Sequence, residues 1–367
     1  MPSILDALLT RLALRLAPRV RDQLTATLVG ELDRHIEEWL MPALQRRAHE
    51  MTTSKFFAEA TQTIAARLAD RIEDAASTLF RNEASNKPLL GSVLYLPTTV
   101  VAGSQPEQYM SASIPLTRDF LHPEFLEFAR LYGLAFELHR KNWEWAFIYE
   151  HLKRAGALQP GKRGLGFGVG MERLPALFAQ AGVYVTATDT PSDDPHWRDS
   201  GQYGGSREHL FAPHIISREA FEERVSFEPC DMTRLPEHLT GYDFCWSSCC
   251  FEHLGDLQRG LDFVIDSTER SLVVGGVACH TTEFNLSSDD ATIESGHDVI
   301  YRKQDLLRLC RTLEERGHQV EPLRIDTGNL VTDCLVDVPP YRKNPHLKLL
   351  IGDFVATSIG LVIRRGR

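Results

Sequence analysis

Residues 163–189, RGLGFGVGMERLPALFAQAGVYVTATD, decide the fold of this chain. We expect a buried strand that ends at Leu165, a turn that contains Gly166, Gly168 and Gly170, a helix over residues 172–180, and a second strand over residues 183–188 that closes with an acid. Glycines at alternate positions permit positive φ and let a ligand press against bare backbone. The amides at the start of the following helix point into the same space. The stretch therefore predicts a site for a nucleotide-like small molecule.

The spacing of the glycines separates two kinds of nucleotide. A dinucleotide fold has G-x-G-x-x-G, with its third glycine where the pyrophosphate meets the helix, and this chain has Met171 at that position. Asp189 closes the second strand, where a carboxylate can accept hydrogen bonds from both ribose hydroxyls. This arrangement resembles the S-adenosylmethionine (SAM) site of the class I SAM-dependent methyltransferases.

Three later segments are similar to further strands of that family. Residues 225–231 resemble its third strand, which implies that Asp231 meets the adenine amino group and Met232 packs on the ring. Residues 242–249, YDFCWSSC, resemble the fourth strand, and FEHLGD after them is similar to the E-H-[LV]-x-D segment of many small-molecule methyltransferases. Residues 272–281 match the fifth. The resemblance implies an α/β fold with a Rossmann-like seven-stranded sheet of order 3-2-1-4-5-7-6, its last strand antiparallel.

One position departs from the family pattern. The family has an acid two residues before the first glycine, and this chain has Gly164 there. We therefore expect the SAM amino group to be held by Glu172 or by a residue upstream of the strand. The cofactor-binding set implied by the resemblance is Gly166, Gly168, Gly170, Glu172, Asp189, Thr190, Asp231, Met232, Ser248 and Cys249.

Composition narrows the class of protein. A chain of 367 residues with 43% hydrophobic and 25% charged residues is typical of a globular protein with ample core. The sequence has no run long enough for a membrane span and no secretory signal pattern, so we expect a cytoplasmic protein. The 7 cysteines all lie in the second half of the chain. Their odd number and apolar surroundings favour reduced core thiols.

The net charge of −10 argues against a nucleic-acid partner. Residues 1–90 hold equal numbers of acidic and basic side chains, so the whole acidic excess lies in the remainder of the chain. Binding to a phosphate backbone depends on lysine and arginine contacts. We expect a small-molecule or glycan acceptor and no nucleic acid.

The first 85 residues predict an all-helical domain. Leucines recur on one helical face, while Arg11, Arg15 and Arg19 repeat on the other. Such apolar stripes need a partner surface, and association into a homo-oligomer is our first expectation. Peripheral contact with a membrane surface through these helices, or a lid over the substrate, are the alternatives.

Residues 86–120 are rich in turn formers and predict a linker, and residues 121–367 predict the methyltransferase domain. We expect helices over 125–138, 142–155 and 305–315, and strands over 320–325 and 354–364. Arg140 and Lys141 are candidate contacts to the SAM carboxylate. The long polar segment after Asp189 and the end of the fifth strand offer candidate substrate contacts at His196, Trp197, Arg198, Tyr203 and Glu283.

Transfer of a methyl group to a hydroxyl needs an acceptor in line with the S–CH₃ bond and usually a base. The expected catalytic side chains follow the fourth and fifth strands. His253 is the first choice for the base because imidazole titrates near neutral pH, His280 is the second, and Glu252 holds the geometry. A divalent metal on oxygen ligands such as Glu283 and Asp289 is possible, but no ligand spacing is specific enough to predict one.

The sequence therefore favours a SAM-dependent O-methyltransferase that acts on a sugar hydroxyl or another polar metabolite. Residues 280–306, which include HTTEFNLSSDDATIESGHDVIY, are similar to methyltransferases of bacterial surface-glycan synthesis, including lipopolysaccharide. Two alternatives remain. An NAD(P)-dependent oxidoreductase would use the same kind of sheet, and a non-catalytic scaffold would bind SAM without turnover.

Overall fold

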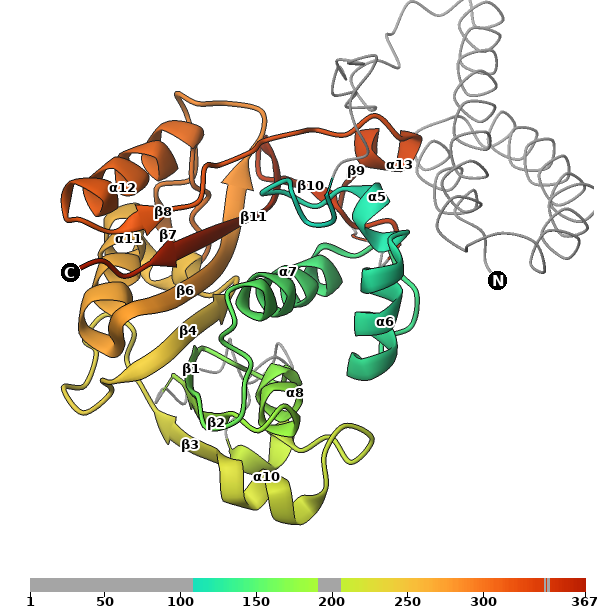
Figure 1. The fold of residues 1–367 in the computed structure, drawn as a ribbon. Helices are drawn as coiled ribbons and strands as arrows, with labels where there is room; N and C mark the ends of the chain where they lie inside the picture. The colour runs from blue at the N-terminus through green and yellow to red at the C-terminus, as the bar shows by residue number, and fades with distance from the viewer. Residues whose placement is uncertain (1–107, 191–205, 340, 342–343) are drawn as a thin grey trace, which may run out of the picture.

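The computed structural model describes residues 108–190, 206–339, 341 and 344–367 (Figure 1). The expected helical domain at residues 1–85, the linker as far as residue 107, and the candidates His196, Trp197, Arg198 and Tyr203 lie outside the described residues. Residues 108–120 are described and pack on the sheet, because Gly360 N donates to the Ser113 carbonyl oxygen at 2.7 Å. None of the described helices is both long and apolar enough to cross a membrane.

The described residues form a nine-stranded sheet of order β3-β2-β1-β4-β6-β11-β10-β9, with β8 paired to β11 off this path. Its first five strands are mutually parallel, and β11 lies antiparallel to β6. The strands are β1 (Arg163–Phe167), β2 (Tyr184–Asp189), β3 (Val225–Pro229), β4 (Tyr242–Ser248), β6 (Leu272–Asn285), β8 (Gln319–Val320), β9 (Val336–Asp337), β10 (Lys348–Ile351) and β11 (Phe354–Arg364).

This order corrects the predicted seven-stranded sheet at one edge. The order as far as β11 and the antiparallel direction of β11 follow the prediction. The expected strand over 320–325 is reduced to the two residues of β8, which pair with only the end of β11. The rest of that edge is covered by β10, which forms a hairpin with β11 and lies between the expected strands 320–325 and 354–364, where we had predicted no strand.

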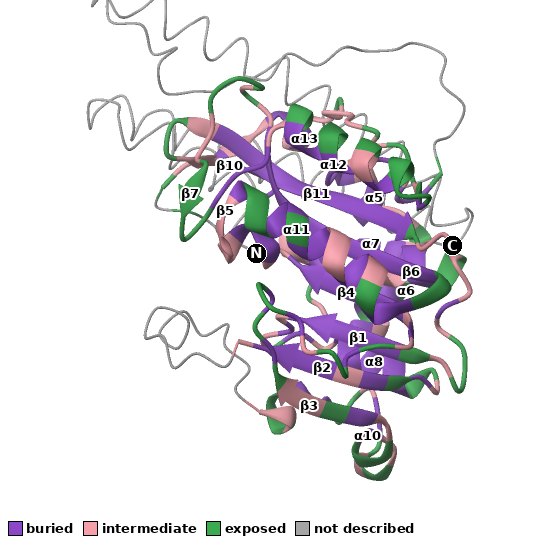
Figure 2. Cartoon of the chain, turned by 90° about the vertical axis from the view of Figure 1, so that its left-hand side faces the viewer, coloured by how far each residue is buried: buried purple, intermediate pink, exposed green. Residues whose placement is uncertain are grey.

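Helices cover both faces of the sheet (Figure 1). On one face lie α6 (Pro123–Tyr132), α7 (Arg140–Arg154), α8 (Leu174–Gln180) and α10 (Arg218–Arg224), and on the other α11 (Leu257–Asp266) and α12 (Lys303–Glu315). Figure 2 shows β1, β4, β6 and β11 buried along most of their length. The remaining described elements are α5 (Thr117–Phe120), η3 (Arg207–Leu210), η4 (Phe251–His253), β5 (Gly255–Asp256), η5 (Ser267–Ser271), β7 (Ser295–Gly296) and α13 (Val331–Cys334).

One face of β1 has no side chains. Gly164 and Gly166 point toward α7 and α8, and the rings of two aromatic residues of β4 lie over them. A Cβ atom at Gly164 would lie 2.4 Å from Phe244 Cζ, and one at Gly166 would lie 2.4 Å from Trp246 Cζ2. No side chain larger than hydrogen fits either position without displacing a ring. The missing acid at position 164 therefore has a packing cause.

The glycine turn begins two residues later than predicted. β1 continues through Gly166 to Phe167, and the left-handed glycines of the turn are Gly168 and Gly170, with φ of +57° and +50°. α8 begins at Leu174 instead of residue 172. The backbone N–H of Arg173 donates to the Tyr132 hydroxyl at 2.8 Å, so this amide does not face a ligand as we had expected.

Gly164→Ala tests the packing of β4 on β1. Because the new methyl group would overlap the Phe244 ring, we expect the free energy of unfolding to fall by about 1–3 kcal/mol. The same substitution in a Phe244→Leu background should cost less, since the smaller side chain leaves room. Urea unfolding of the four chains in this double-mutant cycle measures the coupling. Equal costs in the two backgrounds would contradict the overlap.

Candidate functional site

Three chain segments meet at the carboxyl ends of β1, β2 and β3. In the turn after β1, Val169 N donates to the Thr188 carbonyl oxygen at 3.0 Å. After β3, Cys230 N donates to the Asp189 carbonyl oxygen at 2.8 Å. Parallel strands place their carboxyl ends at one edge of the sheet, which is where open α/β sheets bind ligands. These bonds hold the glycine turn beside Asp189, which ends β2, and Asp231, which follows β3.

Gly168 is the close-packed point of this edge. A Cβ atom at Gly168 would lie 2.8 Å from Cys250 Sγ and 3.6 Å from Met232 Sδ. Its positive φ also disfavours any other residue. The turn after β1 is therefore bare backbone. Beside it lies the thioether of Met232, which we expected to pack on an adenine ring.

The acids at the ends of β2 and β3 differ in burial. Asp189 is 8% exposed, and its Oδ1 accepts a hydrogen bond from Thr190 N at 2.8 Å. Asp231 is exposed, and its Oδ1 accepts from Thr233 N and from the Thr233 hydroxyl at 2.8 and 2.7 Å. In each case a bond from the following residues fixes the carboxylate at the edge of the sheet.

Glu172 lies buried beneath the glycine turn. Its Oε1 accepts a hydrogen bond from the Trp246 indole N–H at 2.6 Å, so the ring that covers Gly166 also holds this carboxyl group. Burial raises the pKa of Glu172 to about 8, against the lowering effects of Trp246 and Lys141. A cationic group placed beside it would favour the ionised form, as a SAM amino group would.

A charge cluster lies where α7 meets the end of β4 and the middle of β11. Lys141 Nζ lies 2.6 Å from Glu144 Oε2 and donates to the Ser248 carbonyl oxygen at 3.2 Å. The hydroxyls of Ser248 and Ser358 donate to the two oxygens of Glu144 at 3.1 and 2.5 Å. Burial alone would raise the pKa of Glu144, but Lys141 and Arg140 outweigh it and hold the pKa at about 2.

A second group of side chains adjoins this cluster. Arg140 pairs with Glu283 Oε1, while Glu283 Oε2 is buried without a hydrogen-bond partner. Glu252 is 1% exposed, and its Oε2 accepts from the Thr282 hydroxyl at 3.0 Å. Cys249 follows β4 with φ of +48°, and its thiol is half-buried. Burial, followed by the charge of Glu144, raises the pKa of Cys249.

The two candidate histidines have different surroundings. His253 Nδ1 lies 2.9 Å from Asp298 Oδ1 and 2.9 Å from the His297 carbonyl oxygen. Burial alone would lower the pKa of His253, but Asp298 and Glu252 raise it above the ordinary value. His280 is fully buried between Ser247 and Ser267, whose hydroxyls lie 2.8 and 3.3 Å from its ring nitrogens.

Burial lowers the pKa of His280 to about 3, so its imidazole is neutral at physiological pH. The ring packs against Phe251 and Phe263 on the α11 face of the sheet. This face is opposite the one that carries Arg140 and Glu283, because residues 280 and 283 differ by an odd number along β6. The structure thus groups Glu252 with Cys249 and Glu283, holds His253 against Asp298, and leaves His280 in the core.

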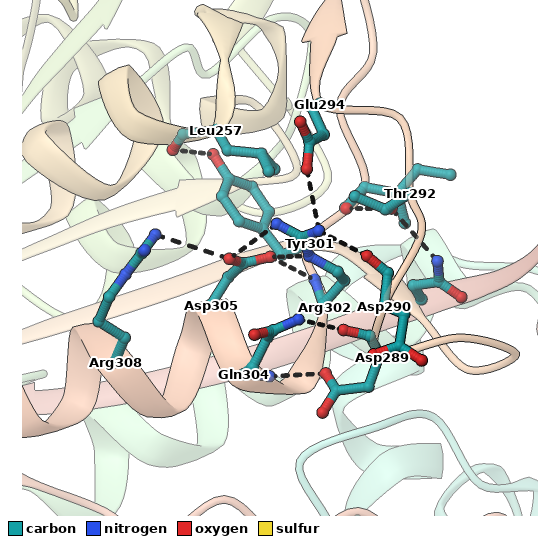
Figure 3. Close-up of polar contacts among 12 residues, drawn as sticks. Leu257, Asp289, Asp290, Thr292, Glu294, Tyr301, Arg302, Gln304, Asp305 and Arg308 are labelled. Atoms are coloured by element: carbon teal, nitrogen blue, oxygen red, sulfur yellow. Dashed lines mark hydrogen bonds and ion pairs between the residues drawn. The ribbon is translucent and has the colours of Figure 1, made fainter.

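The acidic loop after β6 anchors α12 (Figure 3). Asp289 Oδ1 accepts from Gln304 N at 2.8 Å, and the Asp290 carbonyl oxygen accepts from Arg302 Nη1 at 2.8 Å. Arg302 also pairs with Glu294 at 2.9 Å and with Asp305 at 2.8 Å. Asp289 is thus held against the start of α12. Among the described residues, the side chains close enough to share a metal ion with Glu283 are Cys249 and Glu252, not Asp289.

Sequence reasoning missed Glu144 and Ser358. Glu144 lies three and four residues after Lys141 and Arg140, a spacing that places charges on one helical face. That spacing was a usable signal. Ser358 lies in the middle of β11, far from every motif along the chain, and only the sheet topology brings it to Glu144.

No protein-family model and no curated protein matches the sequence. Solved structures do match parts of the chain. The methyltransferase domain of bacterial CtHen1 is 16% identical over 61% of this chain and 99% of that one, with a TM-score of 0.39. Magnesium protoporphyrin IX methyltransferase from Synechocystis, solved with bound S-adenosylhomocysteine (SAH), is 12% identical over 66% and 94%, with a TM-score of 0.37.

A phosphoethanolamine N-methyltransferase from Haemonchus contortus, in complex with SAM, is 16% identical over 54% of this chain, with a TM-score of 0.33. The match spans 42% of that enzyme's length. The [4+2]-cyclase SpnF also resembles the chain, with 18% identity and a TM-score of 0.31. Several of the similar structures are thus SAM-dependent methyltransferases. At this level of identity and with TM-scores below 0.5, the likeness says nothing of the chemistry, which has to be argued from the site.

Glu172→Gln tests the buried acid under the glycine turn. In the ligand-free protein its pKa of about 8 exceeds the ordinary 4.5, so its contribution to stability is complete below pH 4.5 and is lost as the pH rises through 8. One unit of pKa difference corresponds to about 1.4 kcal/mol. We expect the free energy of unfolding of the wild type to fall, between about pH 5 and pH 8.5, by a few kcal/mol more than that of the variant.

Urea unfolding at several pH values measures this difference, and glutamine keeps an acceptor for the Trp246 indole N–H. Two chains whose stabilities change in parallel with pH would show that Glu172 ionises normally in the folded protein.

Proposed function

We propose that this chain is a SAM-dependent methyltransferase that transfers the methyl group to a hydroxyl of a sugar or another polar metabolite. The observation that carries the proposal is the position of Asp189. Its buried carboxylate closes β2 beside the bare turn at Gly168, and backbone bonds from Val169 and Cys230 hold the three neighbouring segments together. A nucleoside fits such an edge because it offers hydroxyls to one carboxylate and a flat base to the next segment.

The residues at this edge take separate parts in binding SAM. Asp189 accepts hydrogen bonds from the ribose hydroxyls, and Asp231 with Met232 takes the adenine. Glu172, and not position 164, faces the amino group of the methionine moiety. The partly buried cations Arg140 and Lys141 of α7 face the carboxylate of that moiety. When bound, SAM supplies an electrophilic methyl group on a sulfonium sulfur.

The start of α8 argues against a dinucleotide. A pyrophosphate needs unpaired backbone amides at a helix N-terminus. Here Arg173 N donates to the Tyr132 hydroxyl, Glu172 N donates to the Val169 carbonyl oxygen, and Pro175 has no N–H. These three positions therefore offer no amide to a pyrophosphate, which favours SAM over NAD(P) as the cofactor.

The acceptor's proton passes to His253 in this proposal. Asp298 and the His297 carbonyl hold Nδ1, which orients the ring and stabilises its protonated form after the transfer. Glu252 stays bonded to Thr282 and fixes the turn from which His253 projects. Polar side chains at the ends of β4 and β6 and in the middle of β11, rather than apolar ones, favour a hydroxyl-bearing acceptor.

Asp189→Asn tests cofactor binding. Because hydrogen bonds to a charged acceptor are worth about 1.5–3 kcal/mol each, the substitution should weaken SAH binding by about 10- to 100-fold. The matched control is Asp243→Asn, which removes a carboxylate that bonds Lys162 and Arg163 N at the opposite edge of the sheet. Calorimetry with SAH measures both affinities. Equal binding by the wild type and Asp189→Asn, or no binding by the wild type, would refute the assignment.

The pH profile of methyl transfer tests the base. We expect the acid limb of kcat/KM, followed by SAH formation with a panel of sugars, to titrate above the ordinary histidine pKa of 6.5. Asp298→Asn should move this limb to lower pH because it removes the negative charge that raises the pKa of His253. His253→Ala should lower kcat by about 10²- to 10⁴-fold.

The matched control for the pH profile is Asp353→Asn, an exposed acid in the turn between β10 and β11. An unmoved limb in Asp298→Asn would exclude His253 as the base. Tight SAH binding without turnover of any acceptor would favour a non-catalytic scaffold.

A further inference from the structure

Three potential metal ligands converge after β4 and at the end of β6. The thiol of Cys249 and a carboxylate oxygen from each of Glu252 and Glu283 all lie within 4.8 Å of one another. We propose that these three side chains bind a divalent transition-metal cation of the zinc type. The second observation that points to a ligand is the orphaned oxygen of Glu283: the residue is 5% exposed, and its Oε2 has no hydrogen-bond partner.

Supporting contacts already orient both carboxylates. Arg140 contacts Glu283 at Oε1 and leaves Oε2 for a ligand, while the Thr282 hydroxyl donates to Glu252 Oε2 at 3.0 Å. The Cys249 thiol lies 3.8 Å from the hydroxyl oxygens of Thr281 and Ser358. Metal sites typically have such a second layer of donors, which fixes the first ligands in position.

The charge of the region also suits a divalent cation. Arg140 and Lys141 face the carboxylates of Glu144, Glu252 and Glu283, so the ionised cluster carries one more negative than positive charge. Binding a divalent cation would release the Cys249 proton to solvent, and the resulting thiolate and cation would together bring the sum to zero. Buried charges are tolerated when they are balanced in this way.

The ligand types select the metal. A thiolate with two carboxylates suits zinc or cobalt, whereas magnesium and calcium prefer oxygen alone. Three protein ligands leave a fourth position open, which is the arrangement of catalytic zinc sites rather than structural ones. That position would lie beside the end of β4, where a metal could bind the acceptor oxygen and lower its pKa. The site itself does not depend on the proposed methyl transfer.

Cobalt titration of the full chain, after treatment with a chelator, tests the proposal without any assay of activity. We expect one equivalent of Co²⁺ to produce the near-ultraviolet charge-transfer absorption of a thiolate ligand, and Zn²⁺ to displace it. Cys249→Ser should abolish this absorption. Glu283→Gln, which has nearly the same shape, should weaken binding by at least about tenfold.

The matched control is Cys250→Ser, the adjacent half-buried thiol, which donates to the Phe167 carbonyl oxygen and should leave the absorption intact. Circular dichroism checks that each variant is folded. Failure of the folded wild type to bind one equivalent of Co²⁺ or Zn²⁺ would overturn the proposal, whatever the variants do. Thiolate absorption that persists in folded Cys249→Ser, or that is lost in Cys250→Ser, would overturn the ligand assignment.

Discussion

The close approach of β4 to β1 is the constraint on which the site depends. Gly164 and Gly166 leave one face of β1 bare, and the rings of Phe244 and Trp246 occupy the space that side chains would take. Trp246 then reaches Glu172 with its indole N–H. An acid at position 164 would collide with Phe244. The buried carboxyl group near the turn is instead that of Glu172, which follows the glycines in the sequence. The same pair of rings thus sets the packing of β1 and the position of Glu172.

α7 supplies the positive charge of the network at the central strands. Its first turns bring Arg140, Lys141 and Glu144 over β4, β6 and β11, where serine hydroxyls and Glu283 complete the network. Buried charges of this kind are costly unless each is paired, and breaking one pair leaves an uncompensated charge. In this cluster Glu283 Oε2 is buried without a hydrogen-bond partner. A cation bound at this oxygen would balance the charge of the carboxylate.

Local sequence signals predicted the central strands but not the contacts between them. The alternation of glycines and the acid at position 189 placed β1, β2 and the turn to within about two residues, because these features act within one segment. The bond from Trp246 to Glu172, the covering of Gly166 and the role of Ser358 depend on strand neighbours far apart along the chain. β10 was missed because its four residues follow a proline-rich segment and are placed in the sheet only by their partners β11 and β9.

A structure of the protein with bound SAH tests the central claim most directly. The account predicts adenosine across the turn at Gly168, with ribose hydroxyls on Asp189, and the amino group of the homocysteine moiety beside Glu172. Density for SAH elsewhere, or an amino group held by residues remote from Glu172, would contradict the account.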